Sequence, residues 1–468
     1  MKVGFYTLGC KVNQYETEAM KEKFTKAGFD VALEKEAADV YVINTCTVTN
    51  MADRKSRQFI SRAKKQNEKA VVAVVGCYAQ VDPEAVSKIE GVDIILGTNE
   101  KSKIVDIVEK RIKQNVNSID ERDAGNNKQV EPADKTGKSE SVEKVIGVLE
   151  RESLSNYRSD GIIAAMESRT RAYIKIQEGC DRFCTYCIIP TARGPVRSRS
   201  EEEIVLEAKG LIESGFKEIV LTGINTALYG AENNKASTAD DSSNKKPALR
   251  RLIDKISEIP GDYRIRLSSL EPNVVNPEDI LEIIGAEKLC HHLHLSIQSG
   301  SNKVLKAMNR KYTREEYINI VNALHDFDPY FAITTDIIVG FPGETEEDFC
   351  DSTDLVKTAG LSRVHVFPYS PRKGTIAAKM EGQIPSDVKK ERARVLSEAS
   401  DKTAVEFHEK CKNAIMKGLF EEIKDDIMTG YTDNYIRIYA KAKEELLNKL
   451  VDVKLKENYL DGMKVEIL

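Results

Sequence analysis

The residues with the clearest chemical potential are Cys180, Cys184 and Cys187, in the run EGCDRFCTYCIIPTARG. Three thiolates can hold three irons of a cubane cluster and leave the fourth iron without a protein ligand. That open iron can bind a cofactor or substrate. A structural zinc site would need a fourth Cys or His, and the first histidine of the chain is the distant His291. The spacing therefore favours a catalytic iron–sulfur site over zinc or three buried apolar cysteines.

A second set of thiols consists of Cys10, Cys46 and Cys77, in the runs LGC, NTC and VGC. Each cysteine follows a run rich in β-branched residues, so each is expected just beyond the carboxyl end of a strand. Ligands of open α/β sheets bind at that edge, where three thiols from separate crossovers can converge. We therefore expect a second three-cysteine iron site. The alternative is three unrelated, half-buried cysteines.

Residues 1–113 are expected to form the sheet that positions this second set. Four apolar runs alternate with amphipathic stretches, a pattern typical of an open parallel α/β sheet. The runs are KVGFYTLG, VYVINT, AVVAVVG and VDIILG. Residues 114–168 begin with a polar stretch without aromatic side chains, which predicts a mobile linker with one short helix around Val142 to Leu149.

Residues 169–400 are expected to form a partial (β/α)6 barrel, with the Cys180 triplet in the loop after its first strand. Active sites of such barrels lie at the carboxyl ends of the strands. The six strand-like runs are YIKIQEG, EIVLTGI, YRIRLSSLEP, HHLHLSIQSG, FAITTDIIVGFPG and RVHVFPYS. Residues 406–468 look like short strands with turns and predict a small all-β barrel. The fold class is thus α/β multidomain with a C-terminal all-β barrel.

Composition indicates a soluble globular protein. The 468 residues carry a net charge of −5, and no apolar run approaches the roughly 18 residues that a membrane helix needs. The amino terminus is expected to be a strand rather than a signal peptide, which predicts a cytoplasmic protein without membrane association. Nine cysteines favour thiolate ligands over disulfides. Cys290, Cys350 and Cys411 are expected to have no role in the chemistry.

The acidic balance gives no global signature of a nucleic-acid binder, although local basic patches exist. Each patch taken alone could equally be a solvated helix face. The patches are Arg54, Lys55, Arg57, Arg62, Lys64 and Lys65; Arg193, Arg197 and Arg199; and Arg310, Lys311 and Arg314. The expected C-terminal barrel is not basic, with 11 Lys and Arg against 13 Asp and Glu from residue 406 onward. Its tyrosines at 431, 435 and 439 could stack on bases, but packing is the commoner role.

The Cys-x3-Cys-x2-Cys triplet, with Tyr186 before its last cysteine, resembles the signature of the radical S-adenosylmethionine (SAM) enzymes. The whole arrangement of domains resembles the radical methylthiotransferases over nearly the entire chain. The resemblance implies that Cys180, Cys184 and Cys187 hold the 4Fe-4S cluster that binds SAM. It implies that Cys10, Cys46 and Cys77 hold an auxiliary 4Fe-4S cluster and that the last domain is a TRAM domain. In that family the radical cluster cleaves SAM to a 5′-deoxyadenosyl radical.

The resemblance also implies which residues line the cofactor pocket. They are Tyr186, Thr222, Gly223, Glu271, Gln298, Ser299, Asp336 and Gly340. The chain departs from the family pattern in three places: Asn225 stands where histidine is commoner, Thr191 where tyrosine is commoner, and the segment 114–168 is unusually long. None of these departures removes a cysteine.

The runs LGCKVNQYETEAM, RIRLSSLEP and TTDIIVGFPGETEEDF are most similar to the branch acting on threonylcarbamoyl-adenosine 37 of tRNA. This resemblance implies methylthiolation of adenine carbon 2 in the tRNA anticodon stem-loop. It also implies an electron donor such as flavodoxin or ferredoxin, and a sulfur donor. The alternatives are a methylthiotransferase acting on isopentenyl-adenosine 37 or a ribosomal-protein aspartate, and a non-catalytic iron–sulfur or zinc RNA-binding protein.

Overall fold

The structure is a computed structural model that describes residues 1–33, 36–48, 50–124, 144–154, 157–163, 166, 170–234, 246–272 and 277–468. The chain divides into two compact units. The first contains residues 1–161 together with 191–194, and the second contains residues 162–190 and 195–468.

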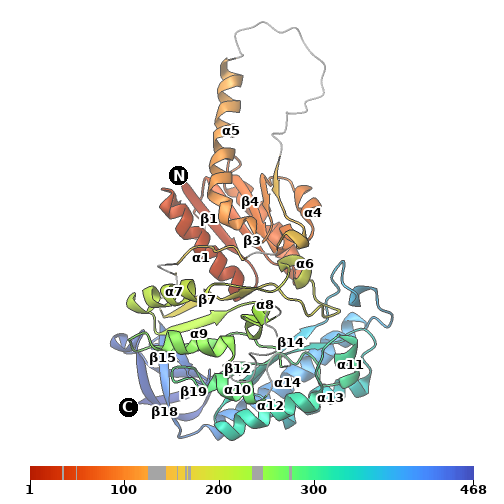
Figure 1. The fold of residues 1–468 in the computed structure, drawn as a ribbon, viewed down its shortest axis with the longest axis vertical. Helices are drawn as coiled ribbons and strands as arrows, with labels where there is room; N and C mark the ends of the chain where they lie inside the picture. Colours follow the sequence, from red (N-terminus) through yellow and green to blue (C-terminus); the bar gives the residue numbers. More distant parts are fainter. Residues whose placement is uncertain are drawn as a thin grey trace. The chain divides into compact units, whose positions relative to one another are not determined.

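The first unit contains a six-stranded, entirely parallel sheet with the strand order β2-β1-β3-β4-β5-β6 (Figure 1). The strands are β1 (Lys2–Thr7), β2 (Asp30–Val31), β3 (Val40–Thr45), β4 (Val71–Gly76), β5 (Ile94–Leu96) and β6 (Val145–Gly147). The helices are α1 (Lys11–Lys26), α2 (Asn50–Gln66), α3 (Cys77–Val81), α4 (Pro83–Ser87) and α5 (Ile104–Ala124), with 3-10 turns η1 (Glu100–Lys103) and η2 (Arg151–Ser153). The open parallel sheet predicted from the four apolar runs is confirmed.

Helices cover both faces of this sheet, which explains why its central strands are continuously apolar. On one face, Phe24 of α1 and Val108 of α5 pack against the strands. On the other face, Ile60 and Ala63 of α2 pack against them, together with residues of α3 and α4. Strands β3 and β4 are buried at every position.

The segment after residue 113 differs from its prediction. Helix α5 continues to Ala124, and Val145–Gly147 is strand β6, paired in parallel with β5, rather than part of a helix. The strand forms because Ile94–Leu96 offers it an open sheet edge, a tertiary contact that outweighs local helical preference. The predicted mobility of residues 125–143 lies outside the described residues.

The second unit begins with six parallel strands in two three-stranded sheets, β11-β10-β7 and β12-β13-β14. Isolated bridges from Ile265 to Leu289 and from Leu270 to Leu295 connect the two sheets. The strands are β7 (Arg171–Lys175), β10 (Glu218–Thr222), β11 (Arg264–Leu267), β12 (His292–His294), β13 (Ala332–Val339) and β14 (Arg363–Pro368), with a small hairpin of β8 (Gln177–Glu178) and β9 (Arg197–Ser198). This is the predicted partial (β/α)6 barrel.

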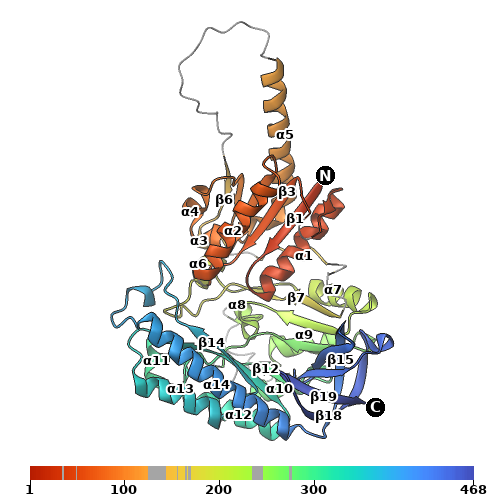
Figure 2. The same ribbon diagram turned by 180° about the vertical axis from the view of Figure 1, so that it is seen from behind.

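Helices α10, α12, α13 and α14 lie along the outside of these strands (Figure 2). The helices of this part are α7 (Glu201–Glu213), α8 (Ala231–Asn234), α9 (Ala248–Ser257), α10 (Pro277–Ile284), α11 (Asn302–Ala307), α12 (Arg314–Phe327), α13 (Glu346–Thr358) and α14 (Ser386–Lys410), with η3 (Thr226–Leu228) and η4 (Ala377–Lys379). Helix α6 (Ile189–Arg193) spans the point where the chain passes into the first unit.

The chain ends in a closed five-stranded barrel with the order β15-β16-β17-β19-β18, which confirms the predicted all-β barrel. Its strands are β15 (Ile415–Lys424), β16 (Ile427–Thr432), β17 (Arg437–Lys441), β18 (Leu450–Tyr459) and β19 (Gly462–Ile467), with the turn η5 (Glu444–Leu446). The barrel begins at Ile415 rather than at residue 406, because α14 continues to Lys410.

Buried charges join this small barrel to the parallel strands within the second unit. Glu218 is fully buried between Arg264 and Arg266, with Nε atoms at 2.7 and 2.8 Å. The same guanidinium groups donate to the carbonyls of Lys417 and Asp433, at 3.0 and 2.9 Å. None of the helices in the described ranges is long and apolar enough to cross a membrane.

Candidate functional site

Three thiols of the first unit lie at the carboxyl edge of its parallel sheet, as predicted. Cys10 caps the start of α1, Cys46 directly follows β3, and Cys77 begins α3 directly after β4. Gly9 permits the close approach of the first two segments. Its φ is +106°, and a Cβ at this position would lie 2.7 Å from Cys46 Cβ and 2.9 Å from its Sγ.

Burial and mutual repulsion favour the protonated thiols at this edge. Burial raises the pKa of Cys46 to about 12, and the neighbouring Cys77 and Cys10 add to this rise. Burial likewise raises the pKa of Cys77, whereas Arg193 and Lys101 lower it. Thiolate is the form that binds a metal, so a metal bound here would displace protons, and nearby cations would favour that exchange.

A buried cluster of charges lies next to these thiols, also in the first unit. Glu16, Lys101 and Arg193 are each at most 1% exposed. The carboxylate of Glu16 accepts hydrogen bonds from both cations, at 3.2 Å from Arg193 Nη2 and at very short distance from Lys101 Nζ. Arg193 and Lys101 thus place two buried cations near the thiols, and both favour the thiolate form of Cys77.

Two asparagines connect this charge cluster to the strand ends. Asn13 accepts from Arg193 and donates to the carbonyl of Thr45, at 3.0 Å, one residue before Cys46. Asn44 accepts from Lys101 at 3.1 Å and donates to the carbonyl of Asn13 at 2.9 Å. These bonds fix the cations relative to the loops that carry the thiols.

The second set of thiols lies in one loop of the second unit, after the first strand of the barrel. The amide of Cys187 donates to the carbonyl of Cys184 at 2.9 Å, which closes a tight turn. Thr185 anchors the loop, because its amide and hydroxyl donate to the carbonyls of Met308 and Ala307, at 3.0 and 2.9 Å. Burial raises the pKa of Cys180 to about 11 and that of Cys187 to about 12, and Cys184 contributes to both rises.

A network of polar side chains surrounds this loop. Arg310 donates to the Tyr186 hydroxyl at 3.0 Å and to Glu271 Oε1 at 2.7 Å. Glu271, which is 5% exposed, also pairs with Arg182 at 3.1 Å and accepts from Asn225 Nδ2 at 3.0 Å. The structure thereby brings together two of the predicted pocket residues, Tyr186 and Glu271.

The other predicted pocket residues lie on β13, at the carboxyl end of β10, or in the loops that follow β10, β12 and β13. Thr222 ends β10 and is buried, and a Cβ on Gly223 would lie 3.0 Å from Gln177 Oε1. Gln298 has a φ of +77°, a left-handed conformation that is costly for a side chain of this kind and is often found at ligand sites. The pKa of Asp336 lies below its usual value. Burial alone would raise this pKa, but the nearby His294, at 3.1 Å, helps to lower it.

Two predicted pocket residues have structural partners. Ser299 is fully buried and accepts from the amide of Ser301 at 3.2 Å. Gly340 donates its amide to Glu344 Oε1 at 2.8 Å, and a Cβ there would lie 2.2 Å from Lys389 Cγ on α14. These contacts account for the identities of Ser299 and Gly340 by packing and hydrogen bonding alone. The role of both residues in the cofactor pocket stays a prediction.

The donor sets fit iron–sulfur clusters. In the described part of the chain, no group of three or more His, Cys, Asp or Glu side chains is arranged to chelate one metal ion. In a cubane each thiolate binds a different iron, so its ligands need not converge on one point. Each set offers three soft sulfur donors. Beside the second set, the buried Oδ1 of Asn225 has no hydrogen-bond partner, as expected for an atom that accepts from a ligand.

Sequence reasoning missed the charged side chains that support both sites. Arg193 and Arg310 were noticed only as members of basic patches, and Glu16, Lys101 and Arg182 were not singled out. Their partners lie in distant segments, so no local pattern reveals the pairing. Of the remaining cysteines, Cys290 and Cys411 are buried, while Cys350 is exposed.

Comparisons with known proteins agree with this geometry. Residues 174–356 match the radical SAM superfamily, and residues 2–97 match the uncharacterised protein family UPF0004. The fold is similar to that of the radical SAM methyltransferase TsrM from Kitasatospora setae, with a TM-score of 0.55, 13% identity, and coverage of 89% of this chain and 78% of that chain. The fold and the cysteine loop thus define a radical SAM protein, whose family implies SAM and a 4Fe-4S cluster.

Curated relatives extend over nearly the whole chain. The threonylcarbamoyladenosine tRNA methylthiotransferase MtaB of Bacillus subtilis is 42% identical, over 97% of this chain and 93% of its own length. MtaB of Aquifex aeolicus is 40% identical over 97% of this chain and all of its own length. The tRNA-2-methylthio-N(6)-dimethylallyladenosine synthase of Clostridium tetani is 36% identical over 96% of this chain and 92% of its own length. The chain belongs to the radical SAM methylthiotransferase family, and it is an enzyme of that class.

Proposed function

We propose that this enzyme adds a methylthio group to carbon 2 of N-threonylcarbamoyl-adenosine 37 in the tRNA anticodon loop. The observation that carries the proposal is the identity of 42% and 40%, over nearly the full chain, to two proteins named for that nucleoside. The synthase named for dimethylallyladenosine is 36% identical, which keeps isopentenyl-adenosine 37 as the second candidate. A ribosomal-protein aspartate is the third.

The reaction needs radical chemistry because the C–H bond at carbon 2 of adenine is not activated. No side chain of ordinary pKa can remove that proton. The bound clusters and SAM supply the radical, the sulfur and the methyl group. The protein provides binding, orientation and exclusion of water.

The residues divide this work between two sites. Cys180, Cys184 and Cys187 would hold the radical cluster. Close to them, Glu271 and Asn225 present a carboxylate and an unpartnered amide oxygen, suited to donors of a bound cofactor. Arg310 holds Glu271 and the Tyr186 hydroxyl in place, at 2.7 and 3.0 Å.

The first unit would hold the auxiliary 4Fe-4S cluster on Cys10, Cys46 and Cys77. Support comes from their shared sheet edge and from the buried cations Lys101 and Arg193, which lower the pKa of Cys77. The reaction also requires an electron donor, such as a flavodoxin or ferredoxin, and a sulfur donor. A cytoplasmic location fits a tRNA substrate.

Nucleoside mass spectrometry tests the proposal. A host lacking 2-methylthio nucleosides should gain 2-methylthio-threonylcarbamoyl-adenosine when it expresses the wild-type chain, but not when it expresses Cys184→Ala. The reconstituted enzyme should modify tRNA bearing the threonylcarbamoyl group and leave tRNA bearing isopentenyl-adenosine unchanged.

Two other products would contradict the proposal. Appearance of 2-methylthio-isopentenyl-adenosine alone would assign the chain to the second candidate. A methylthiolated ribosomal protein with unmodified tRNA would assign it to the third.

A further inference from the structure

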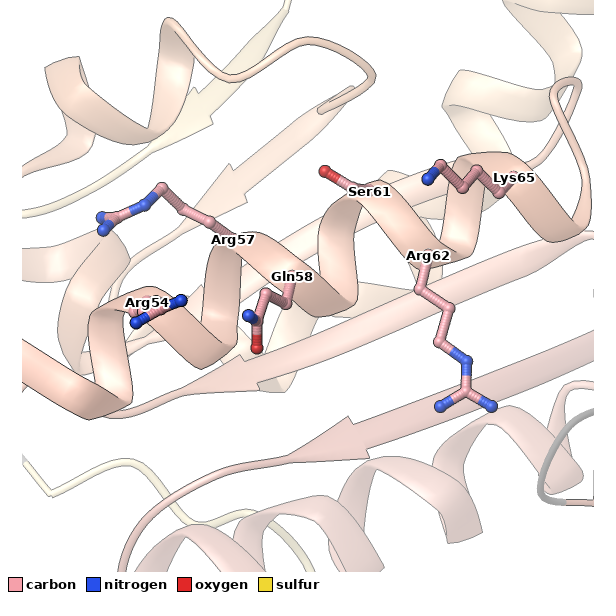
Figure 3. A pocket seen from close by; sticks show the side chains of 6 residues that line it. All are labelled: Arg54, Arg57, Gln58, Ser61, Arg62 and Lys65. Carbon is pink, nitrogen blue, oxygen red and sulfur yellow. The ribbon is translucent and has the colours of Figure 1, made fainter.

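The outward face of α2 carries the clearest charged surface that the chemistry above does not use. The helix contains six Lys and Arg residues and one Asp, a net charge of +5 within a chain of net charge −5. Six of its side chains line a shallow hollow of about 480 Å³ (Figure 3). They are Arg54, Arg57, Gln58, Ser61, Arg62 and Lys65, called the α2 face below.

The spacing of the α2 face separates it from the core side of the helix. Its members recur at intervals of three and four residues, so they share one side. Ile60 and Ala63 on the opposite side are fully buried against the sheet. From Arg54 to Lys65 the α2 face extends for about 16 Å at 1.5 Å per residue, long enough to contact several successive phosphates.

The four cations of the α2 face are not neutralised by any described carboxylate at ion-pair distance. Arg57 donates to the Tyr78 hydroxyl at 3.5 Å, and the Arg62 guanidinium lies 5.9 Å from the centre of the Tyr6 ring. Both contacts orient a cation without cancelling its charge. Lys64 differs, because it turns toward the sheet and pairs with Asp93 at 3.3 Å.

This arrangement is unfavourable for the isolated helix. Arg54 and Arg57, like Arg62 and Lys65, are like charges three residues apart and repel one another. Arg54 also lies near the amino end of the helix, where the helix dipole disfavours a cation. An external anion would relieve both effects. Three of the four cations are arginines, whose planar guanidinium groups bind phosphate through two parallel hydrogen bonds.

We propose that the α2 face binds the phosphate backbone of the RNA substrate. The inference rests on the proposed function and adds that the first unit, and not the acidic C-terminal barrel alone, contacts the RNA. Charge complementarity favours RNA because the four cations of the α2 face form no ion pair with a described carboxylate and are available to a polyanion. An acidic redox protein is the competing occupant.

The test measures binding of a fluorescent tRNA by anisotropy at several salt concentrations. The variant R54Q/R57Q/R62Q/K65Q should bind about tenfold or more weakly at 0.1 M salt. The slope of log affinity against log salt should fall by about three, since each lost phosphate contact contributes about 0.7 to 0.9. The variant R54Q/K65Q should lose about half of that slope.

A matched control replaces four exposed lysines elsewhere: K390Q/K402Q/K410Q/K449Q, on α14 and before β18. It removes the same charge and should keep the wild-type salt slope. Iron content and melting temperature should be unchanged in the quadruple α2 variant. Unchanged values would show that its weaker tRNA binding is not caused by unfolding.

Three outcomes would overturn the inference. Wild-type affinity and slope in the α2 variant would mean that this face does not touch RNA. Equal losses in the control would mean that only net charge matters. Normal RNA binding with slowed reduction by flavodoxin would assign the face to the electron donor. Failure of the proposed function is distinct, because it would appear as a different methylthiolated product of the wild-type chain, or as no tRNA binding by the wild-type chain, whatever the α2 variant does.

Discussion

The two cysteine sites are built in opposite ways. In the second unit, all three thiols come from one loop of eight residues, anchored by Thr185 to the carbonyls of Ala307 and Met308. In the first unit, each thiol follows a different strand, and 66 residues lie between Cys10 and Cys77. The compact site depends on local spacing, whereas the dispersed site depends on the whole sheet being in register.

The surroundings differ as well. The thiols of the dispersed site lie beside the buried Glu16, Lys101 and Arg193, in which one carboxylate pairs with two cations. The loop site faces Glu271, whose carboxylate Arg182 and Arg310 both contact. The dispersed site therefore resembles a holder for an anion, and the loop site offers acceptors and donors in the way a cofactor pocket does.

The largest expected effects come from replacing single cysteines, because each replacement should disable one site and leave the other intact. Cys184→Ala should reduce 5′-deoxyadenosine formation to background, because the radical cluster loses one of three ligands. Iron should fall to about four per chain, the content of the remaining cubane. Deoxyadenosine assays and iron analysis of the reconstituted protein measure both.

Cys46→Ala should have the complementary effect, with deoxyadenosine still formed and no methylthiolated nucleoside produced. The reason is that Cys46 belongs to the first unit and has no part in the loop. Methylthiolation at the wild-type rate in this variant would show that the dispersed site does not deliver sulfur.

Arg193→Gln tests the electrostatic difference between the surroundings of the two cysteine sites. Removing one partner of a buried pair costs about 3–5 kcal/mol, and here it also removes a cation that lowers the pKa of Cys46 and Cys77. In a Cys184→Ala background, iron retention should drop. Chemical unfolding and iron analysis measure the two effects.

A matched control for this variant is Arg199→Gln, which breaks the buried pair with Glu207 in the second unit. It should cost a similar amount of stability and leave iron in the first unit unchanged. Equal iron losses in both variants would mean that Arg193 acts through stability alone.

A smaller effect concerns pH and the second unit. Arg266 and Arg264 hold the pKa of Glu218 well below its ordinary value of 4.5, although burial opposes them. The carboxylate therefore contributes stability that is fully present above pH 4.5 and is lost as pH falls below it. Between about pH 5 and 3, wild-type unfolding free energy should fall by about 2 kcal/mol more than that of Glu218→Gln. Parallel curves for the two proteins would contradict this assignment.

The smallest effect tests the unpartnered oxygen of the loop site. Asn225→Ala should weaken SAM binding about fivefold, the value of one hydrogen bond of about 1 kcal/mol. Equilibrium binding to the reconstituted enzyme measures it. An unchanged affinity in Asn225→Ala would remove Asn225 from the pocket.

Sequence reasoning succeeded where the signal was local. The apolar runs at 40–45 and 70–76 became buried parallel strands, and Cys46 and Cys77 directly follow them, as the strand-end placement predicted. It failed where distant segments decide the structure. Val145–Gly147 became a strand because β5 offers an edge, and the triad of Glu16, Lys101 and Arg193 joins three segments that no short pattern relates.

The membership of residues 191–194 in the first unit has a consequence for synthesis on the ribosome. When residue 161 has emerged, the sheet is complete, but the ion pair of Glu16 with Arg193 cannot yet form. The amino-terminal unit can finish folding only after the loop with Cys180, Cys184 and Cys187 has been translated, because Arg193 follows that loop. Cotranslational folding thus couples the completion of the dispersed cysteine site to the appearance of the cysteine loop.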